Sequence, residues 1–138
     1  MVIVVHALWG LAQATAIRNI PLLVVGGMGG HILLDAIPHR DLTAPWEVVV
    51  DILTGTVLFF FLRNIYSLPW LFGWSVLFSC IPDFDVLFRF CGITRRNYFF
   101  SHFPSWHGSM GSFRGVMMNI LTGVLLLVLF IMGMRGRF

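Results

Sequence analysis

The chain has 138 residues, of which 58% are hydrophobic and only 11% are charged, and its mean hydropathy is +0.88. These values lie outside the range of soluble globular domains and indicate a polytopic membrane protein without a separate soluble domain. The net charge of +3 comes from nine arginines and no lysine; juxtamembrane arginines explain it, and no nucleic-acid-binding pattern is present.

Five apolar runs predict an all-α membrane helical bundle. At roughly 20 residues per span, the chain accommodates about five helices, within a range of four to six, so residues 1–138 form a single integral-membrane domain. The first and third runs are short for a complete span. The N-terminus lacks the basic region and cleavage site of a signal peptide, which indicates a retained first helix. The runs cover about residues 2–17, 20–38, 47–64, 69–88 and 115–134.

The segment covering residues 26–41 begins as a membrane helix and ends in residues of the kind that bind metals. His31, Asp35 and His39 are spaced i, i+4 and i+8, so they project from one face if the helix continues to Pro38. Ionisable groups in an apolar span cost roughly 2.5–3.5 kcal/mol each and require a partner, of which a bound cation is the simplest. The glycines of this helix let neighbouring backbones approach and predict a central position in the bundle.

Five crossings would place the termini on opposite faces and gather all five histidines and all six acidic residues on one of them. Mixed histidine and carboxylate ligation suits zinc, manganese or iron, whereas magnesium and calcium sites rely on oxygen. We therefore predict one or two divalent metal ions, zinc in the first instance. The predicted metal ligands are His6, His31, Asp35, His39, Asp83, Asp85, His102 and His107.

Two helix ends share a pattern in which Ile-Pro is followed by a ligand-type residue, a spacer and an aspartate. The first contains Pro38, His39 and Asp41, and the second contains Pro82 with Asp83-Phe-Asp85. Proline ends or kinks a helix, so both pairs of polar residues should leave the helical path and face one centre. Two similar halves would bring these corners together, as repeats do around transporter sites.

The remaining polar residues have predicted roles at the same face. Asp41 and Asp51 are the catalytic candidates, with Asp51 moving the proton; alternatively, Asp41 caps the loop or pairs with an arginine, and Asp51 complements a helix start. Arg95, Arg96 and Arg114 are expected to bind a substrate phosphate, because guanidinium groups contact phosphate in a bidentate manner. The aromatic side chains between residues 98 and 106 would seat this loop in the headgroup region.

The order of these motifs resembles the YdjM-like family of bacterial membrane-bound metal-dependent hydrolases. It consists of His6 on a first helix, a helix ending in Pro82-Asp83-Phe-Asp85, and His102 and His107 five residues apart with a serine nearby. The family is distantly similar to zinc-dependent phospholipase C and the zinc single-strand nucleases. The resemblance implies a zinc cluster that cleaves phosphoesters, in the bacterial inner membrane.

The chain departs from this family pattern around its last two histidines. Phe103 and Pro104 replace the arginine and glycine of the family motif, and Gly108 separates His107 from Ser109. The spacing of the histidines is kept, so ligation is still expected. The role of the missing arginine then falls to one of the three arginines expected to bind phosphate.

We therefore expect a metal-dependent phosphohydrolase that acts on a membrane lipid phosphoester. Three alternatives remain open at this point. A divalent-cation or proton transporter would place ligands at the midplane with polar groups leading to both faces. A small structural subunit of a membrane complex would bind metal only for stability, and a haem or other redox protein would use the histidines but fewer carboxylates.

Overall fold

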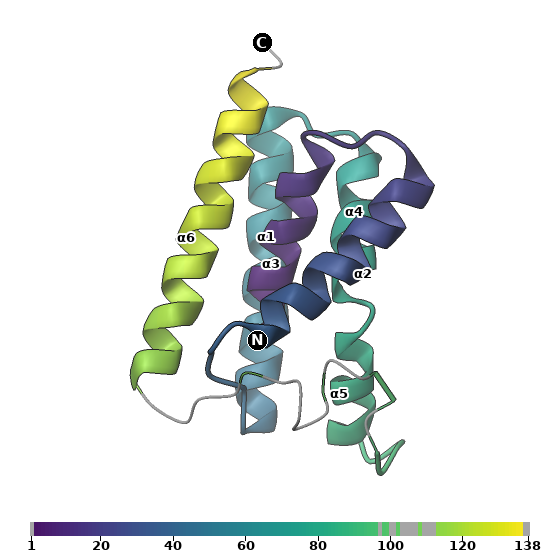
Figure 1. The fold of residues 1–138 in the computed structure, drawn as a ribbon, viewed down its shortest axis with the longest axis vertical. Helices are drawn as coiled ribbons and strands as arrows, with labels where there is room; N and C mark the ends of the chain where they lie inside the picture. Colours follow the sequence, from purple (N-terminus) through teal and green to yellow (C-terminus); the bar gives the residue numbers. More distant parts are fainter. Residues whose placement is uncertain (1, 97, 100–101, 103–107, 109–112, 137–138) are drawn as a thin grey trace.

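The computed structural model describes residues 2–96, 98–99, 102, 108 and 113–136. The described residues are helical and contain no β-strand, which confirms the all-α prediction. Proline 82 divides the predicted fourth helix in two. The elements are α1 (Ile3–Ala14), α2 (Ile20–Ala36), α3 (Pro45–Tyr66), α4 (Trp70–Cys80), α5 (Asp83–Phe90) and α6 (Phe113–Arg135) (Figure 1).

Two helices of the described chain, α3 and α6, are long and apolar enough to cross a membrane. The 22 residues of α3 extend about 33 Å at 1.5 Å per residue, which matches a hydrocarbon core of about 30 Å. A third span results if α4 and α5, bent by 59° at their junction, are counted as one broken span. The helices α1 and α2 are apolar but shorter, with 12 and 17 residues.

Local sequence signals set the helix ends that matter for the site. The prediction that the third helix is short for a complete span is wrong, because α3 has 22 residues. It begins at Pro45, and Glu47 accepts hydrogen bonds from the N–H groups of Thr43 and Ala44 just before it. By contrast, α2 ends at Ala36, because residues before a proline favour extended backbone, and Ile37 has ψ 136°.

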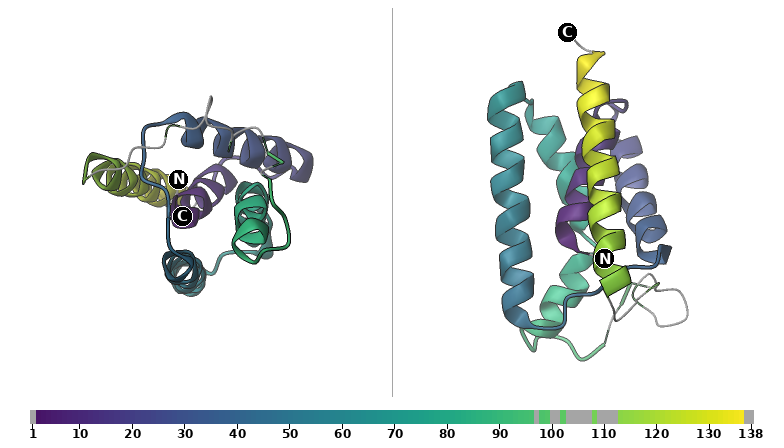
Figure 2. Two further views of the ribbon diagram at one scale, coloured as in Figure 1. Left: turned by 90° about the horizontal axis from the view of Figure 1, so that it is seen from below. Right: turned by 90° about the vertical axis from the view of Figure 1, so that its left-hand side faces the viewer.

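The central helix is α1, whereas the sequence had predicted that the glycine-rich α2 would be central. Seen along the bundle, α1 is surrounded by α2, α3, α4 and α6, and it packs against each of them (Figure 2). The backbones of α1 and α4 approach closely at Gly10, where an added Cβ would lie 2.6 Å from the Cα of Val76. The expected close approach of α2 does occur, since a Cβ on Gly27 would lie 3.0 Å from the backbone of Phe78.

The polar segments meet at one end of the bundle, the lower end in Figure 1. The start of α1, the end of α2, the start of α3 and all of α5 lie there, while the C-terminal end of α6 lies at the opposite end (Figure 1). Between the two ends most of the interior is apolar and includes the buried Leu11, Leu23, Phe72 and Phe130, with Gln13 and Ser75 as buried polar exceptions. The fold therefore concentrates the ionisable side chains where α1, α2 and α5 converge.

Candidate metal centre

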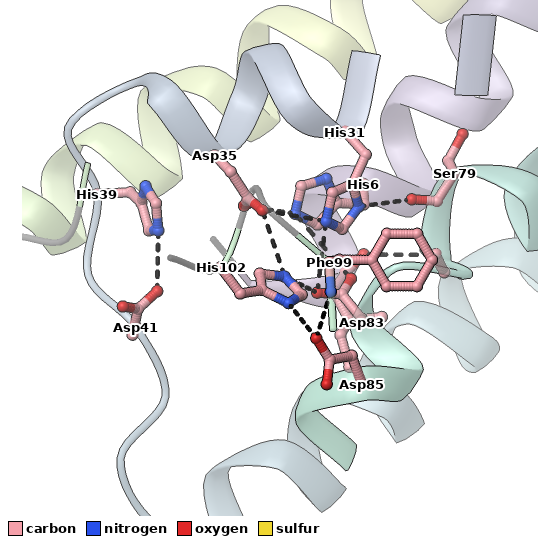
Figure 3. A network of polar contacts seen from close by, with 12 residues as sticks. His6, His31, Asp35, His39, Asp41, Ser79, Asp83, Asp85, Phe99 and His102 are labelled. Atoms are coloured by element: carbon pink, nitrogen blue, oxygen red, sulfur yellow. Dashed lines mark hydrogen bonds and ion pairs between the residues drawn. The ribbon is translucent and has the colours of Figure 1, made fainter. Parts of the chain in front are cut away.

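Five buried side chains from four segments converge at this end (Figure 3). The central helix α1 contributes His6 and α2 contributes His31 and Asp35, while Asp83 comes from the first turn of α5 and His102 from the loop that follows α5. None of the five is more than 8% exposed. We refer to these five residues as the metal cluster.

Asp35 lies between the three imidazoles of the metal cluster. Its carboxylate oxygens are 3.0 Å from Nε2 of His31, 3.3 Å from Nε2 of His6 and 3.4 Å from Nε2 of His102. The i, i+4 spacing places His31 and Asp35 on one face of α2, as the sequence predicted. Three ring nitrogens thus point to one carboxylate from three different segments.

Asp83 faces the same ring nitrogens from the opposite side. Its Oδ1 is 3.9 Å from Nε2 of His31 and 3.8 Å from Nε2 of His102, and its Oδ2 is 4.0 Å from Nε2 of His6. These distances exceed hydrogen-bond length but suit ligands of a shared ion. Metal–ligand bonds of 2.0–2.2 Å in tetrahedral geometry place the ligand atoms roughly 3.4 Å apart.

Two overlapping sets of three ligand atoms are close enough together that a shared ion could draw them in. One contains His6, His31 and Asp83, the other contains His31, Asp35 and His102, and within each set the ligand atoms lie within 4.8 Å of one another. These buried histidines and aspartates could therefore hold a metal ion.

His6 gives an independent indication that the metal cluster is incomplete without a ligand. The side chain is 0% exposed, and its Nδ1 has no hydrogen-bond partner among the described residues, while Nε2 lies 3.3 Å from Oδ1 of Asp35. Its ring stacks on that of His31 with centroids 3.8 Å apart. Leaving a buried polar atom without a partner costs about 1–3 kcal/mol, and a bound ion is a recognised explanation for such an atom.

Hydrogen bonds behind the cluster orient two of its histidines. Nδ1 of His31 lies 2.8 Å from the backbone oxygen of Ser79, which can only accept, so this nitrogen carries the proton and Nε2 is the available ligand. Oδ2 of Asp85 accepts the N–H groups of Tyr98 and Phe99 at 2.7 and 2.9 Å and lies 3.5 Å from Nδ1 of His102. Outer partners of this kind fix the ring orientation of metal-binding histidines.

Asp85 is therefore placed behind His102, although the sequence had grouped it with Asp83 as a ligand. The prediction that both residues leave the helical path is wrong, because they occupy the first turn of α5. Residues two apart on a helix point in different directions. One carboxylate consequently faces the metal cluster while the other faces the loop.

His39 and Asp41 form a separate pair beside the metal cluster (Figure 3). Nε2 of His39 lies 2.8 Å from Oδ1 of Asp41, and Nδ1 lies 2.6 Å from the backbone oxygen of Ile37. The prediction that His39 shares a helix face with His31 and Asp35 is wrong, because α2 ends at Ala36. Neither member of the pair belongs to the two sets of possible ligands.

The other predicted site residues take different positions. The carboxylate of Asp51 accepts the backbone N–H groups of Ile3 and Val4, so it completes the N-terminus of α1. The side chains of Arg95, Arg96 and Arg114 are exposed, and His107 lies outside the described residues.

Gly108 makes backbone contacts beside the metal cluster that the sequence did not predict. Its N–H donates to the backbone oxygen of Asp35 at 2.8 Å, and its own oxygen accepts from the N–H of His39 at 3.0 Å. A Cβ at this position would lie 2.7 Å from the backbone oxygen of Ile37, so glycine is needed for the close approach. The sequence feature that could have indicated these contacts is the position of Gly108 directly after the predicted ligand His107.

Comparison with known proteins gives no match to a family model, to a curated protein or to a solved structure.

Proposed function

We propose that the protein is a membrane-embedded, metal-dependent hydrolase that cleaves a lipid phosphoester at the metal cluster. The observation that carries this proposal is the convergence of three imidazole Nε2 atoms on two buried carboxylates. Zinc fits this mixed nitrogen and oxygen donor set. The motif order that resembles the YdjM-like hydrolases supports phosphoester chemistry.

The contacts of His31 favour one ion over two within the described residues. Both sets of possible ligands include His31, and its Nδ1 is engaged with the backbone oxygen of Ser79. One ring nitrogen binds one ion, so the two sets describe a single site with ligands drawn from both. His107 is not part of this argument.

The metal and the protein have separate tasks in this proposal. A bound zinc ion would supply a Lewis acid and would acidify a water molecule. The protein residues hold the donor set in place, exclude bulk water by burial, and provide Oδ2 of Asp83 to hold a proton, since this oxygen has no hydrogen-bond partner among the described residues. The exposed Arg95, Arg96 and Arg114 are available to the phosphate of a substrate.

The position of the metal cluster favours a hydrolase over a transporter. Transport would need a polar path to the opposite end of the bundle. Gln13 continues the polar interior as far as Ser75, to which it donates at 2.9 Å. Beyond it, Leu68, Phe72 and Phe130 are apolar and buried. A site at one end suits a substrate whose head group remains at the membrane interface.

We further propose that all five helical crossings lie in the membrane, with α4 and α5 as one broken crossing. The short helix α1 is surrounded by the others, so it does not need the full length of a lipid-exposed span (Figure 2). Location in the bacterial inner membrane follows from the resemblance alone.

The test is elemental analysis of the purified protein together with phosphate release from phosphatidic acid vesicles. We expect the protein to retain zinc and to release phosphate, and His6→Ala to lose both. His39→Ala is the matched control, because His39 is equally buried but lies outside the metal cluster, and it should keep its zinc. Zinc retained by His6→Ala, or hydrolysis by metal-free protein, would overturn the proposal.

A further inference from the structure

An apolar groove leads from the lipid-facing surface to the metal cluster. It has a volume of about 420 Å³ and lies between α1, α3, α4 and α5. This volume is in the range of roughly 300–1,000 Å³ that is typical of ligand sites. Its walls include Ile3 and Ala7 of α1, Gly55 and Phe59 of α3, and Gly73 and Leu77 of α4.

The polar end of the groove is Asp83. This residue lines the groove and also belongs to the metal cluster, where its Oδ2 is 4.0 Å from Nε2 of His6. The lining is otherwise apolar apart from Thr56 and Cys80. A molecule in the groove would thus have hydrocarbon surroundings along its length and a carboxylate of the candidate metal centre at one end.

Two glycines keep the groove open, one on each of its facing walls. A Cβ added to Gly55 would have only the Cα of Val4 within 4 Å, at 3.8 Å. A larger side chain at this position would therefore extend into the space of the groove. A Cβ on Gly73 would lie 3.3 Å from the ring of Phe59, which already borders the groove. The helix α3 packs mainly on α1, which leaves its side toward α4 available.

The groove is open on the side that would face lipid. Phe60 is 53% exposed and Leu77 is 38% exposed, one on each wall. A partner helix is a poor occupant, because a helix about 10 Å across would fill this volume with roughly one turn. A hydrocarbon chain is narrower, is already present in the surrounding membrane, and matches the apolar lining.

We propose that this groove binds one hydrocarbon chain of the lipid substrate and thereby places the attached phosphate beside Asp83. The proposal rests on the proposed hydrolase function, to which it adds that the substrate is recognised by its chain. Long-chain phosphoesters should accordingly be preferred to short-chain ones. Chain length should act mainly through KM, because the apolar walls of the groove, away from Asp83, do not touch the reacting atoms.

The test uses Thr56→Trp, which places an indole in the groove, and Thr54→Trp as a matched control. Both threonines are exposed on α3, but only Thr56 lines the groove. With hexadecyl and butyl phosphate as substrates, we expect wild-type protein and Thr54→Trp to prefer the long chain by at least tenfold in kcat/KM. Thr56→Trp should lose that preference, mainly through a raised KM for hexadecyl phosphate.

A binding measurement separates failure of this inference from failure of the proposed function. Hexadecyl phosphate with a photoactivatable diazirine in mid-chain should cross-link to α3 and α4 in wild-type protein and Thr54→Trp, and at most a tenth as much in Thr56→Trp. Cross-linking in the groove without hydrolysis would refute the hydrolase but keep the hydrocarbon site. Hydrolysis that is indifferent to chain length, with cross-links spread over all helices, would overturn the groove and keep the hydrolase.

Discussion

Asp83 and Asp85 are two residues apart, yet the structure places them in different relations to the metal cluster. Asp83 offers a carboxylate to the same centre as His6 and His31, whereas Asp85 lies behind His102. We expect zinc affinity to fall most strongly in Asp83→Asn and to fall moderately in Asp85→Asn. It should be unchanged in Asp41→Asn, where the aspartate is paired with His39 outside the metal cluster.

The contacts of Asp85 determine how far zinc affinity should fall in Asp85→Asn. In Asp85→Asn the remaining amide oxygen can still accept the N–H groups of Tyr98 and Phe99, so the loop should stay in place. What is lost is the negative charge that faces Nδ1 of His102 at 3.5 Å. Removing such an outer partner typically weakens metal binding roughly 10–100-fold, or about 1.4–2.7 kcal/mol.

The loss of zinc affinity in Asp83→Asn should exceed that range, because this substitution replaces a charged ligand by a neutral amide. Zinc affinity of the detergent-purified variants would be measured by competition with a colorimetric chelator, with helix content by circular dichroism as the check on folding. Equal losses in Asp83→Asn and Asp85→Asn would refute the assignment of different roles. A loss in Asp41→Asn similar to that in Asp83→Asn would refute the separation of the two groups.

Two further predictions concern the packing of α1. Gly10→Ala should lower the free energy of unfolding by about 1–3 kcal/mol, because its Cβ would meet the backbone of α4. Gly29→Ala, where nothing lies within 4 Å, should raise it by up to about 1 kcal/mol through helix propensity; equal effects in chemical unfolding would contradict the close approach. Asp51→Ala should cost about 1 kcal/mol of stability through the lost helix cap and should keep its zinc. A drop in zinc content without a drop in stability would instead support a direct role at the site.

The meeting of polar residues at one end of the bundle could be predicted from the sequence. The alternating directions of the five predicted helices are enough to assign each helix end to one end of the bundle, and the spacing of His31 and Asp35 is enough to place them on one side of a helix. These inferences need only the number of helices and the helical period. They remain valid although the sequence misplaced several helix ends.

The distinction between ligands and outer partners could not be predicted. His31 is oriented by a backbone oxygen, which every residue has, so no sequence pattern reveals it. The separation of Asp83 from Asp85 depends on whether the chain after Pro82 is extended or begins a new helix, and proline permits both. His39 lies outside the metal cluster because α2 ends at Ala36, before Pro38, so His39 does not continue the helix face of His31 and Asp35.

The central position of α1 was also missed, because glycine content indicates close approach but does not indicate which helix is surrounded. Gly27 of α2 and Gly10 of α1 each allow a close crossing with α4, and the short helix is the one that can be enclosed. Enclosure then explains the polar contacts of α1. Its N-terminus cannot rely on water, so Asp51 of α3 accepts its first N–H groups.

The same enclosure leaves His6 buried one turn further along α1, within reach of Asp35 and Asp83. A bound ion at this point would tie the central helix to α2 and α5 and to the loop that carries His102. The metal would therefore fix the position of α5 relative to α1. Both helices line the apolar groove. On this reasoning, metal binding and the binding of a hydrocarbon chain are coupled through Asp83, the one residue that takes part in both.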